Sequence, residues 1–149
     1  MITVKQLLDK KGHEVYSIQP GDTVYSALEK MADKDVGALM VLDGSKLVGI
    51  FSERDYARKL ILHGKSSKES KVQDFMSTAL YTVNPSDSIY HCMALMTDKR
   101  VRHLPVLDQN EIVGLISIGD VVNAIISEQK AIIKDLEDYI TGSGYGNKM

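Results

Sequence analysis

Two short stretches decide the fold: GIFSERD at residues 49–55 and GLISIGD at residues 114–120. Both have the pattern Gly-x-x-Ser-x-x-Asp, and they stand 65 positions apart. The same offset places Pro20 on Pro85 and keeps about forty residues in register without a gap. Self-similarity at a fixed period is the sequence signature of a repeated structural unit. The sequence therefore predicts two copies of one small unit.

Each copy is predicted to form a strand, a helix, two further strands and a second helix. Asp22 is expected to cap the first helix, because a short acidic side chain can accept a backbone hydrogen bond there. From Val24 onward, apolar residues recur at helical spacing. Pairs of β-rich runs on either side of turn residues predict a hairpin in each copy. The expected strands cover residues 15–18, 38–42, 47–51, 104–107 and 112–116.

One such unit is too small to cover both faces of its sheet. The two copies should therefore pack together through their sheets around a pseudo-twofold axis, with clefts between them. The expected fold class is α/β, of the α+β kind, built from two βαββα repeats. Residues 1–149 would form a single module, with repeats at residues 12–62 and 77–128 and an exposed polar connection at residues 63–71.

A long helix is expected to begin at Val121, and its apolar stripe continues past the length that one repeat needs. We expect it to stop at Gly142, which makes residues 129–142 an extension and leaves residues 143–149 as a loose tail. The surplus stripe should pack on an N-terminal helix near Leu7 and Leu8 or on a partner chain. We predict a homodimer.

The composition excludes several classes of function. The formal net charge is −2 with charges of both signs scattered along the chain, so a dedicated nucleic-acid surface is not expected. The only cysteine, Cys92, can form no intramolecular disulfide, and the four histidines lack the spacing of zinc ligands. No apolar run approaches a membrane span. We therefore expect a cytoplasmic protein with no metal, no nucleic-acid partner and no membrane partner.

The sequence also lacks the motifs of common catalytic sites. It contains no Gly-x-Ser-x-Gly elbow, no His-Glu-x-x-His, no Cys-x-x-Cys pair and no complete phosphate-loop motif. We therefore predict a binding module and not an enzyme.

The serine and aspartate of each stretch stand where a strand is expected to run into a helix. Backbone N–H groups at such a junction suit a phosphate, and a serine hydroxyl adds a donor. A carboxylate one turn later can accept two hydrogen bonds from a ribose diol, and glycine before the turn would let a ligand approach closely. The alternative is that Ser52 and Ser117 only cap their helices, with Asp55 and Asp120 closing capping boxes that need no ligand.

With these motifs the sequence resembles a tandem cystathionine-β-synthase (CBS) domain pair, also called a Bateman module. The matching runs are residues 36–39, 49–59, 100–106 and 117–120, and they are similar to the small stand-alone members of bacteria and plant organelles.

The resemblance implies that AMP, ATP, NAD or a similar adenosine ligand acts as a regulator in a cleft between the repeats. It implies that the signature serines contact phosphate and that Asp55 and Asp120 contact ribose. It also implies an adenine slot of strand-edge residues, which here are Ser17, Val36, Gly37, Ala38, Thr82, Val101, Arg102, His103 and Pro105.

The two copies differ in charge. Where the first has Asp35, Gly37 and Ala38, the second has Arg100, Arg102 and His103. Arginine fits phosphate through its fork of N–H donors. Our hypothesis is therefore that the cleft of Ser117 and Asp120 is the stronger site, with Arg102 and His103 nearby and Arg54 or Arg58 reaching across.

Three classes of function follow, in this order. The first is an adenine-nucleotide-binding regulatory or energy-sensing protein that acts on a separate, unidentified partner. A ligand that binds one arrangement of the two repeats more tightly shifts the protein toward that arrangement, and this would change its fit to the partner. The second is a ligand-independent dimerisation or interaction module. The third and weakest is an enzyme acting on the bound nucleotide.

Overall fold

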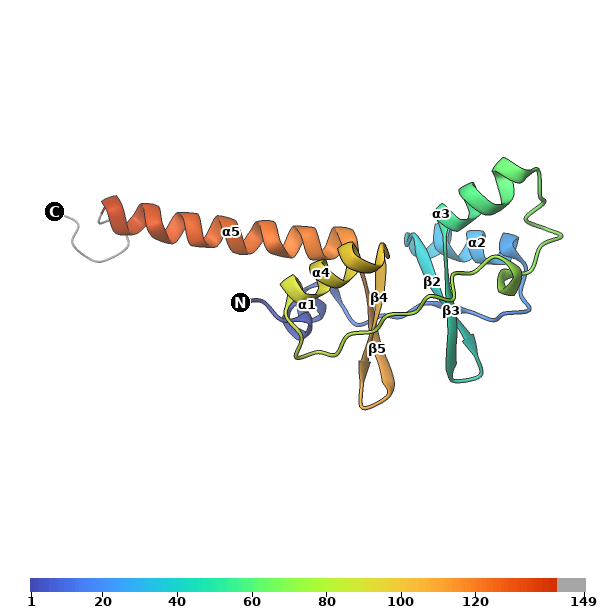
Figure 1. The fold of residues 1–149 in the computed structure, drawn as a ribbon, viewed down its shortest axis with the longest axis horizontal. Coiled ribbons are helices and arrows are strands. Elements are labelled where there is room, and N and C mark those ends of the chain that lie inside the picture. The colour runs from blue at the N-terminus through green and yellow to red at the C-terminus, as the bar shows by residue number, and fades with distance from the viewer. Residues whose placement is uncertain (142–149) are drawn as a thin grey trace.

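The structure is a computed structural model, and it describes residues 1–141. The expected helix end at Gly142 and the expected loose tail at residues 143–149 lie outside the described residues. Two small sheets stand side by side, each with its helices on the outer side, and one long helix projects from the body (Figure 1). The α+β class with two packed repeats and a long C-terminal helix is confirmed.

The first repeat contains a three-stranded sheet in the order β1-β2-β3. A parallel pairing joins β1 to β2, and an antiparallel hairpin joins β2 to β3. The elements are β1 (Ser17–Ile18), α2 (Val24–Lys34), β2 (Ala38–Asp43), β3 (Lys46–Ser52), α3 (Glu53–Asp55), the π-helix η1 (Tyr56–Leu60) and the 3-10 helix η2 (Ile61–His63).

The second repeat has the same plan. It contains α4 (Ile89–Lys99), the antiparallel hairpin of β4 (His103–Asp108) and β5 (Glu111–Ser117), and α5 (Ile118–Thr141). The strand equivalent to β1 is reduced to a single parallel bridge between Val83 and Val106. Two further helices, α1 (Val4–Lys11) and the 3-10 helix η3 (Val72–Asp74), precede the first and second repeats.

Three details of the predicted elements are wrong. The first strand spans Ser17–Ile18 and not residues 15–18, and α5 begins at Ile118 and not at Val121. The N-cap of α2 is Thr23 and not Asp22. The reason is that the Asp22 carboxylate already accepts the Gln19 N–H at 3.0 Å, so the Thr23 hydroxyl accepts the Ser26 N–H at 3.1 Å.

The central residues of β2 and β4 are buried on both faces of their sheets. On β2, Leu39 and Val41 belong to the core of the first repeat, while Met40 on the opposite face is also fully buried. On β4, Leu104 and Val106 belong to the core of the second repeat. The alternation of a strand thus supplies a core and an inter-repeat face at once.

The segments before the two repeats are exchanged, in the sense that each packs on the repeat that it does not directly precede. Helix α1 precedes the first repeat but packs on the second, where Leu7 and Leu8 join its core. The segment around η3 precedes the second repeat but packs on the first, where Val72 joins its core. Matching backbone hydrogen bonds fix both, from Val4 N to Asp87 O at 2.8 Å and from Val72 N to Asp22 O at 2.9 Å.

The glycine of each signature makes room for the exchanged segment. A Cβ on Gly114 would lie 2.7 Å from Leu8 Cδ2, and a Cβ on Gly49 would lie 2.5 Å from Met76 Sδ. The expectation that these glycines admit a ligand is therefore wrong, since both face protein. They allow close packing between a strand and the segment that crosses over it.

Helix α5 leaves the body after its first three turns. Val121 is buried, and Glu128 accepts hydrogen bonds from the Ile2 N–H and the Tyr90 hydroxyl. The start of the helix therefore packs against the N-terminal segment and α4. The surplus stripe does not pack on α1, so the first of its two expected partners is wrong. Exposed apolar side chains on α5 include Val122, Ile126, Ile132, Ile133, Leu136 and Ile140.

Gly114→Ala is expected to lower the free energy of unfolding by about 1–3 kcal/mol, because its methyl group overlaps Leu8. Denaturant unfolding measures the change. Gly119→Ala is the matched control, since its Cβ would meet nothing closer than Ser117 Oγ at 3.6 Å. Leu8→Ala makes room for the methyl group, so the double variant should lose less than the sum of the two single losses. Additive losses would contradict the docking of α1 on β5.

Candidate functional site

Two clefts lie between the repeats, and each takes one wall from each repeat. The larger, about 640 Å³, contains Ser52 and Asp55 and is called the Asp55 cleft here. The smaller, about 440 Å³, contains Ser117 and Asp120 and is called the Asp120 cleft. Both are open, so side chains do not plug the grooves next to the two signatures.

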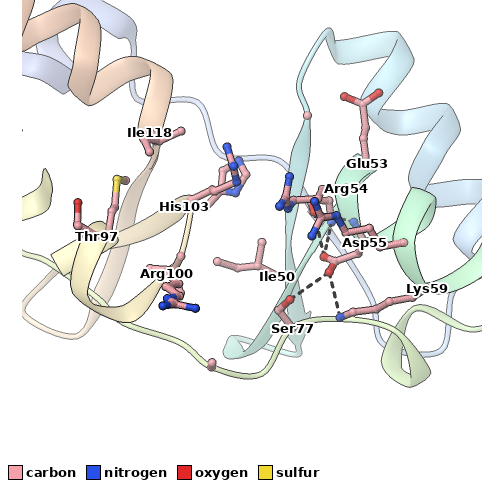
Figure 2. Close-up of a pocket in the computed structure, with 17 residues that line it drawn as sticks. Ile50, Glu53, Arg54, Asp55, Lys59, Ser77, Thr97, Arg100, His103 and Ile118 are labelled. Atoms are coloured by element: carbon pink, nitrogen blue, oxygen red, sulfur yellow. Dashed lines mark hydrogen bonds and ion pairs between the residues drawn. The ribbon is translucent and has the colours of Figure 1, made fainter. Parts of the chain in front are cut away.

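The walls of the two clefts are built reciprocally. In the Asp55 cleft, α3 and η1 of the first repeat face residues 100–103, which join α4 to β4 in the second. In the Asp120 cleft, the start of α5 faces residues 35–38, which join α2 to β2 in the first. Figure 2 shows Arg100 and His103 on one wall of the Asp55 cleft and Arg54, Asp55 and Lys59 on the other.

The Asp55 carboxylate serves its own helix and also the cleft wall. Its Oδ2 accepts the Ser52 N–H and the Ser52 hydroxyl, each at 3.0 Å, and the Ser52 Oγ accepts the Asp55 N–H at 3.1 Å. Its Oδ1 accepts the Ser77 hydroxyl at 3.2 Å and pairs with Lys59 Nζ at 3.0 Å (Figure 2). The capping box expected at the first signature is thus present.

Asp120 has the same local geometry with a different partner. Its Oδ2 accepts the Ser117 N–H at 2.8 Å and the ammonium of Lys11, from the exchanged helix α1, at 2.5 Å. Partial burial raises the pKa of this carboxyl, but the hydrogen bonds from Lys11 and Ser117 outweigh it, so the pKa lies below its usual range. Lys11 also donates to the Leu115 carbonyl at 2.7 Å.

The arginines gather in the cleft opposite to the one we expected. Arg54, Arg58 and Arg102 all line the Asp55 cleft, and none of them lines the Asp120 cleft. The hypothesis that they surround Asp120 is therefore wrong. The reason is topological, because the α4–β4 junction that carries Arg102 faces the helix of the other repeat's signature and not that of its own.

Arg100 is a further cation of this cleft that the hypothesis left out. Within residues 1–141, the four guanidinium groups of Arg54, Arg58, Arg100 and Arg102 form no ion pair. Desolvation, and then repulsion from Arg102 and Arg58, lowers the pKa of Arg54. The cleft therefore carries an excess of positive charge, which Glu53 and Asp55 offset only in part.

The Asp120 cleft carries the opposite charge. Its charged lining consists of one lysine and three carboxylates, beside the Tyr16 phenol and the imidazole that it shares with the other cleft. Asp35 occupies the position equivalent to Arg100, and both are helix C-caps in the left-handed conformation with φ of 54° and 55°. One structural position thus carries opposite charges in the two clefts.

His103 lines both clefts and stands between them. Burial lowers its pKa, and the nearby Lys11 ammonium lowers it further, although Asp120 and Asp55 oppose the change. The lowered pKa favours the neutral imidazole, in which one ring nitrogen donates and the other accepts.

The remaining predicted site residues divide between several places. Val101 lines the Asp55 cleft, Val36 and Ala38 line the Asp120 cleft, and Gly37 lines both. Ser17 lines a separate pocket of about 290 Å³, Thr82 is exposed outside both clefts, and Pro105 is buried in β4. These three residues are therefore not brought together with the others.

Sequence reasoning missed several residues of the clefts. In the Asp55 cleft these include Lys59 and Ser77, which bind the signature carboxylate. In the Asp120 cleft they include Lys11, Glu14 and Tyr16. The alignment of the repeats contained a signal for Arg100 and Asp35, whereas Lys11 and Ser77 lie outside the aligned region and could not be found that way.

Among residues 1–141 no group of three or more histidine, cysteine, aspartate or glutamate side chains is placed to hold a metal ion. Over the same residues, no helix combines the length and the apolar character needed to cross a membrane.

A pair of pseudosymmetric α+β repeats with ligand-sized clefts between them defines the class of this protein. The model of the CBS domain matches the chain twice, at residues 4–62 and 72–127. The chain therefore belongs to the CBS-domain family, as a tandem CBS pair. Both matched segments begin early enough to include the exchanged helices α1 and η3.

Known proteins agree with this assignment. The CBS domain-containing protein CBSX3, mitochondrial, of Arabidopsis thaliana is 45% identical over 129 residues, which are 83% of this chain and 62% of that protein. The CBS domain-containing protein YhcV of Bacillus subtilis is 31% identical over 79% of this chain and 84% of its own length. This chain thus spans less than two thirds of the plant relative. Both relatives are named as CBS-domain proteins and not as enzymes.

A solved structure shows the same fold at high identity. The structure of a protein described as a signal-transduction protein with CBS domains, from Burkholderia ambifaria, superimposes with a TM-score of 0.81 at 47% identity. The match covers 86% of this chain and 96% of that chain. The tandem arrangement is therefore shared over nearly the whole of both chains.

The lowered pKa of His103 predicts a pH dependence of stability. An unfolded histidine titrates near pH 6.5, so below about that pH the unfolded chain binds more protons and the folded state loses stability. The contribution of the neutral His103 side chain to the free energy of unfolding is complete above about pH 6.5. It is lost as the pH falls toward the pKa of His103 in the folded state, at no more than about 1.4 kcal/mol per pH unit.

His103→Gln should therefore lose less stability than the wild type between about pH 7.5 and about pH 5.5, measured by denaturant unfolding. His63→Gln, at the exposed end of η2, should keep the wild-type dependence. Equal dependences in His103→Gln and the wild type would contradict the assignment.

Proposed function

We propose that this protein is a regulatory adenine-nucleotide sensor whose ligand binds in the Asp55 cleft. The observation that carries the proposal is the set of four arginines around an open cleft of about 640 Å³, none of which forms an ion pair with another described residue. A guanidinium group binds phosphate through parallel N–H donors. Pockets for small ligands commonly measure about 300–1,000 Å³, so a nucleotide is of suitable size.

The surroundings of Asp55 fit a ribose. Its Oδ2 caps the helix, whereas its Oδ1 holds the Ser77 hydroxyl and the Lys59 ammonium, both of which line the cleft. Ribose hydroxyls are donors of the same kind as the Ser77 hydroxyl and take its place in the proposed complex. Capping and ligand binding then use different oxygens of one side chain.

Apolar side chains in the same cleft fit an adenine ring. They come from both repeats, with Ile50 from β3 in the first and Met96, Val101 and Ile118 in the second. Ligand sites combine such apolar walls with a few polar groups that fix orientation. A nucleotide bound here would contact both repeats at once.

A ligand that bridges two repeats can regulate a protein only if it binds one geometry more tightly than another. We propose that this change of geometry alters the fit to a separate regulated protein. The fully buried Cys92 thiol agrees with a reducing cytoplasm, which remains our expected location, while the Arabidopsis relative carries the word mitochondrial in its name.

A thermal-shift panel of AMP, ADP, ATP, NAD and S-adenosylmethionine tests the proposal. A ligand at about 100 times its Kd should add about 2.7 kcal/mol to the free energy of unfolding. Arg102→Ala should weaken nucleotide binding about 10–100-fold, because it removes charge-assisted hydrogen bonds worth about 1.5–3 kcal/mol. Lys46→Ala, in the exposed part of β3, should leave binding unchanged. No shift with any of the five ligands would contradict the sensor function.

The exposed face of α5 favours a second property, self-association. Val122, Ile126, Gln129, Ile133, Leu136 and Ile140 follow one another at alternating intervals of four and three residues. This spacing is typical of helices that pair with other helices. Lys130 and Glu137 border one side of this stripe, so antiparallel pairing of two α5 helices would bring opposite charges together. We therefore propose that two chains form a homodimer through their α5 helices. The same contact would serve a ligand-independent interaction module, the second class of function.

Ile133→Lys should convert the dimer into a monomer, because it places a charge in the apolar contact. Light scattering after size-exclusion chromatography measures the mass. Ala131→Lys makes the same change on an exposed position outside the stripe and should remain dimeric. A wild-type protein that is monomeric at all accessible concentrations would contradict dimerisation but not nucleotide binding.

A further inference from the structure

The charge of the Asp55 cleft exceeds what one phosphate group can balance. Five cations line it, namely Arg54, Arg58, Lys59, Arg100 and Arg102, and only Glu53 and Asp55 oppose them. Lys59 is already paired with Asp55 at 3.0 Å. Among residues 1–141 the four arginines form no ion pair, and Glu53 is the one other carboxylate that lines the cleft with them.

These arginines stand on both walls. Arg54 and Arg58 belong to α3 and η1 of the first repeat, while Arg100 and Arg102 belong to the α4–β4 junction of the second. Figure 2 shows Arg54 and Arg100 on opposite sides of the cleft. An anion held by all of them must therefore extend from one wall to the other.

The π-helical turn contributes to this arrangement. In the first repeat the signature helix continues as η1, and both Arg58 and Lys59 line the cleft. In the second repeat the equivalent residues are Asn123 and Ala124, on a regular α-helix, and neither lines the Asp120 cleft. Wide turns of this kind often occur at functional sites.

A phosphate monoester carries about two negative charges at neutral pH. It would satisfy the arginines of one wall and leave those of the other in mutual repulsion. A chain of two or three phosphates supplies both the additional charge and the additional length.

We propose that the Asp55 cleft selects nucleoside di- and triphosphates over monophosphates and that Arg100 holds the phosphates beyond the first. The proposal rests on the nucleotide-sensor function and narrows its ligand class. The Asp120 cleft has Asp35 at the position of Arg100, and Glu14 nearby, so it disfavours the same ligands.

The duplication supplies its own control substitutions. Arg100 and Asp35 are equivalent C-caps with nearly the same left-handed φ, and each is exposed. Arg100→Asp and Asp35→Arg therefore place in each repeat the residue that the other repeat already accommodates. Both variants should fold, which thermal unfolding without ligand verifies.

Calorimetric titration with AMP, ADP and ATP, without divalent cations, tests the selectivity. The wild type should bind ATP at least about tenfold more tightly than AMP, with ADP between them. In Arg100→Asp the affinity for ATP should fall about tenfold further than the affinity for AMP, so that the preference for ATP is lost. Arg100→Gln removes the charge but keeps a side chain of similar length, and it should also reduce the affinity for ATP more than the affinity for AMP. Asp35→Arg should keep the wild-type preference in the Asp55 cleft.

Other outcomes separate this inference from the function on which it rests. Equal affinities for AMP and ATP in the wild type would overturn the polyphosphate selectivity and leave the sensor function standing. A preference for ATP that survives in Arg100→Asp would overturn the role of Arg100. No binding of any of the three nucleotides would overturn both proposals.

Discussion

The exchange of helices between the repeats is the constraint on which the rest of the structure depends. Each repeat receives part of its core from the segment that precedes the other, so neither core is complete in one repeat alone. Burial of these apolar side chains fixes how the two sheets face each other. The two clefts exist because this fixed arrangement leaves grooves beside the signature helices. The glycines of the signatures permit the exchange, since Leu8 and Met76 occupy the space that a methyl group would need.

The sequence alone predicted the repeat, the two hairpins, the helices and the presence of clefts, because all of these follow from local periodicity and from the 65-residue offset. It did not predict the exchange, because Leu8 corresponds to Met76, which lies 68 positions later and outside the ungapped alignment. The error about the arginines has the same origin. Which wall faces which signature is a property of chain topology, and residue types at matched positions cannot decide it. Once the topology is known, Arg102 and Asp55 belong to one cleft without further assumptions.

The two interpretations of the signature, helix cap and ligand site, are compatible in this structure. The serine hydroxyl and one carboxylate oxygen close the capping box in each repeat, which satisfies backbone groups that the helix start leaves unpaired. The second oxygen of Asp55 binds the Ser77 hydroxyl and the Lys59 ammonium, and both of these residues line the cleft. The cap also holds this carboxylate in one orientation, and a fixed acceptor loses less entropy on binding than a mobile one. A residue that stabilises its helix can therefore also prepare a binding site.

Duplication followed by changes at a few equivalent positions explains how one fold produces two clefts of different character. The backbone is nearly the same at residues 35–38 and 100–103, including the left-handed C-cap, yet the side chains differ in charge. Because Asp35 and Arg100 are exposed, their replacement costs the folded state little, and the charge of a cleft can change without a change in the core. His103 lies on the border and contacts both environments, which explains why lysine, arginine and two aspartates all act on its pKa. Charge placed in one cleft thus acts on a group that also lines the other, and the two sites are electrostatically linked through a single imidazole.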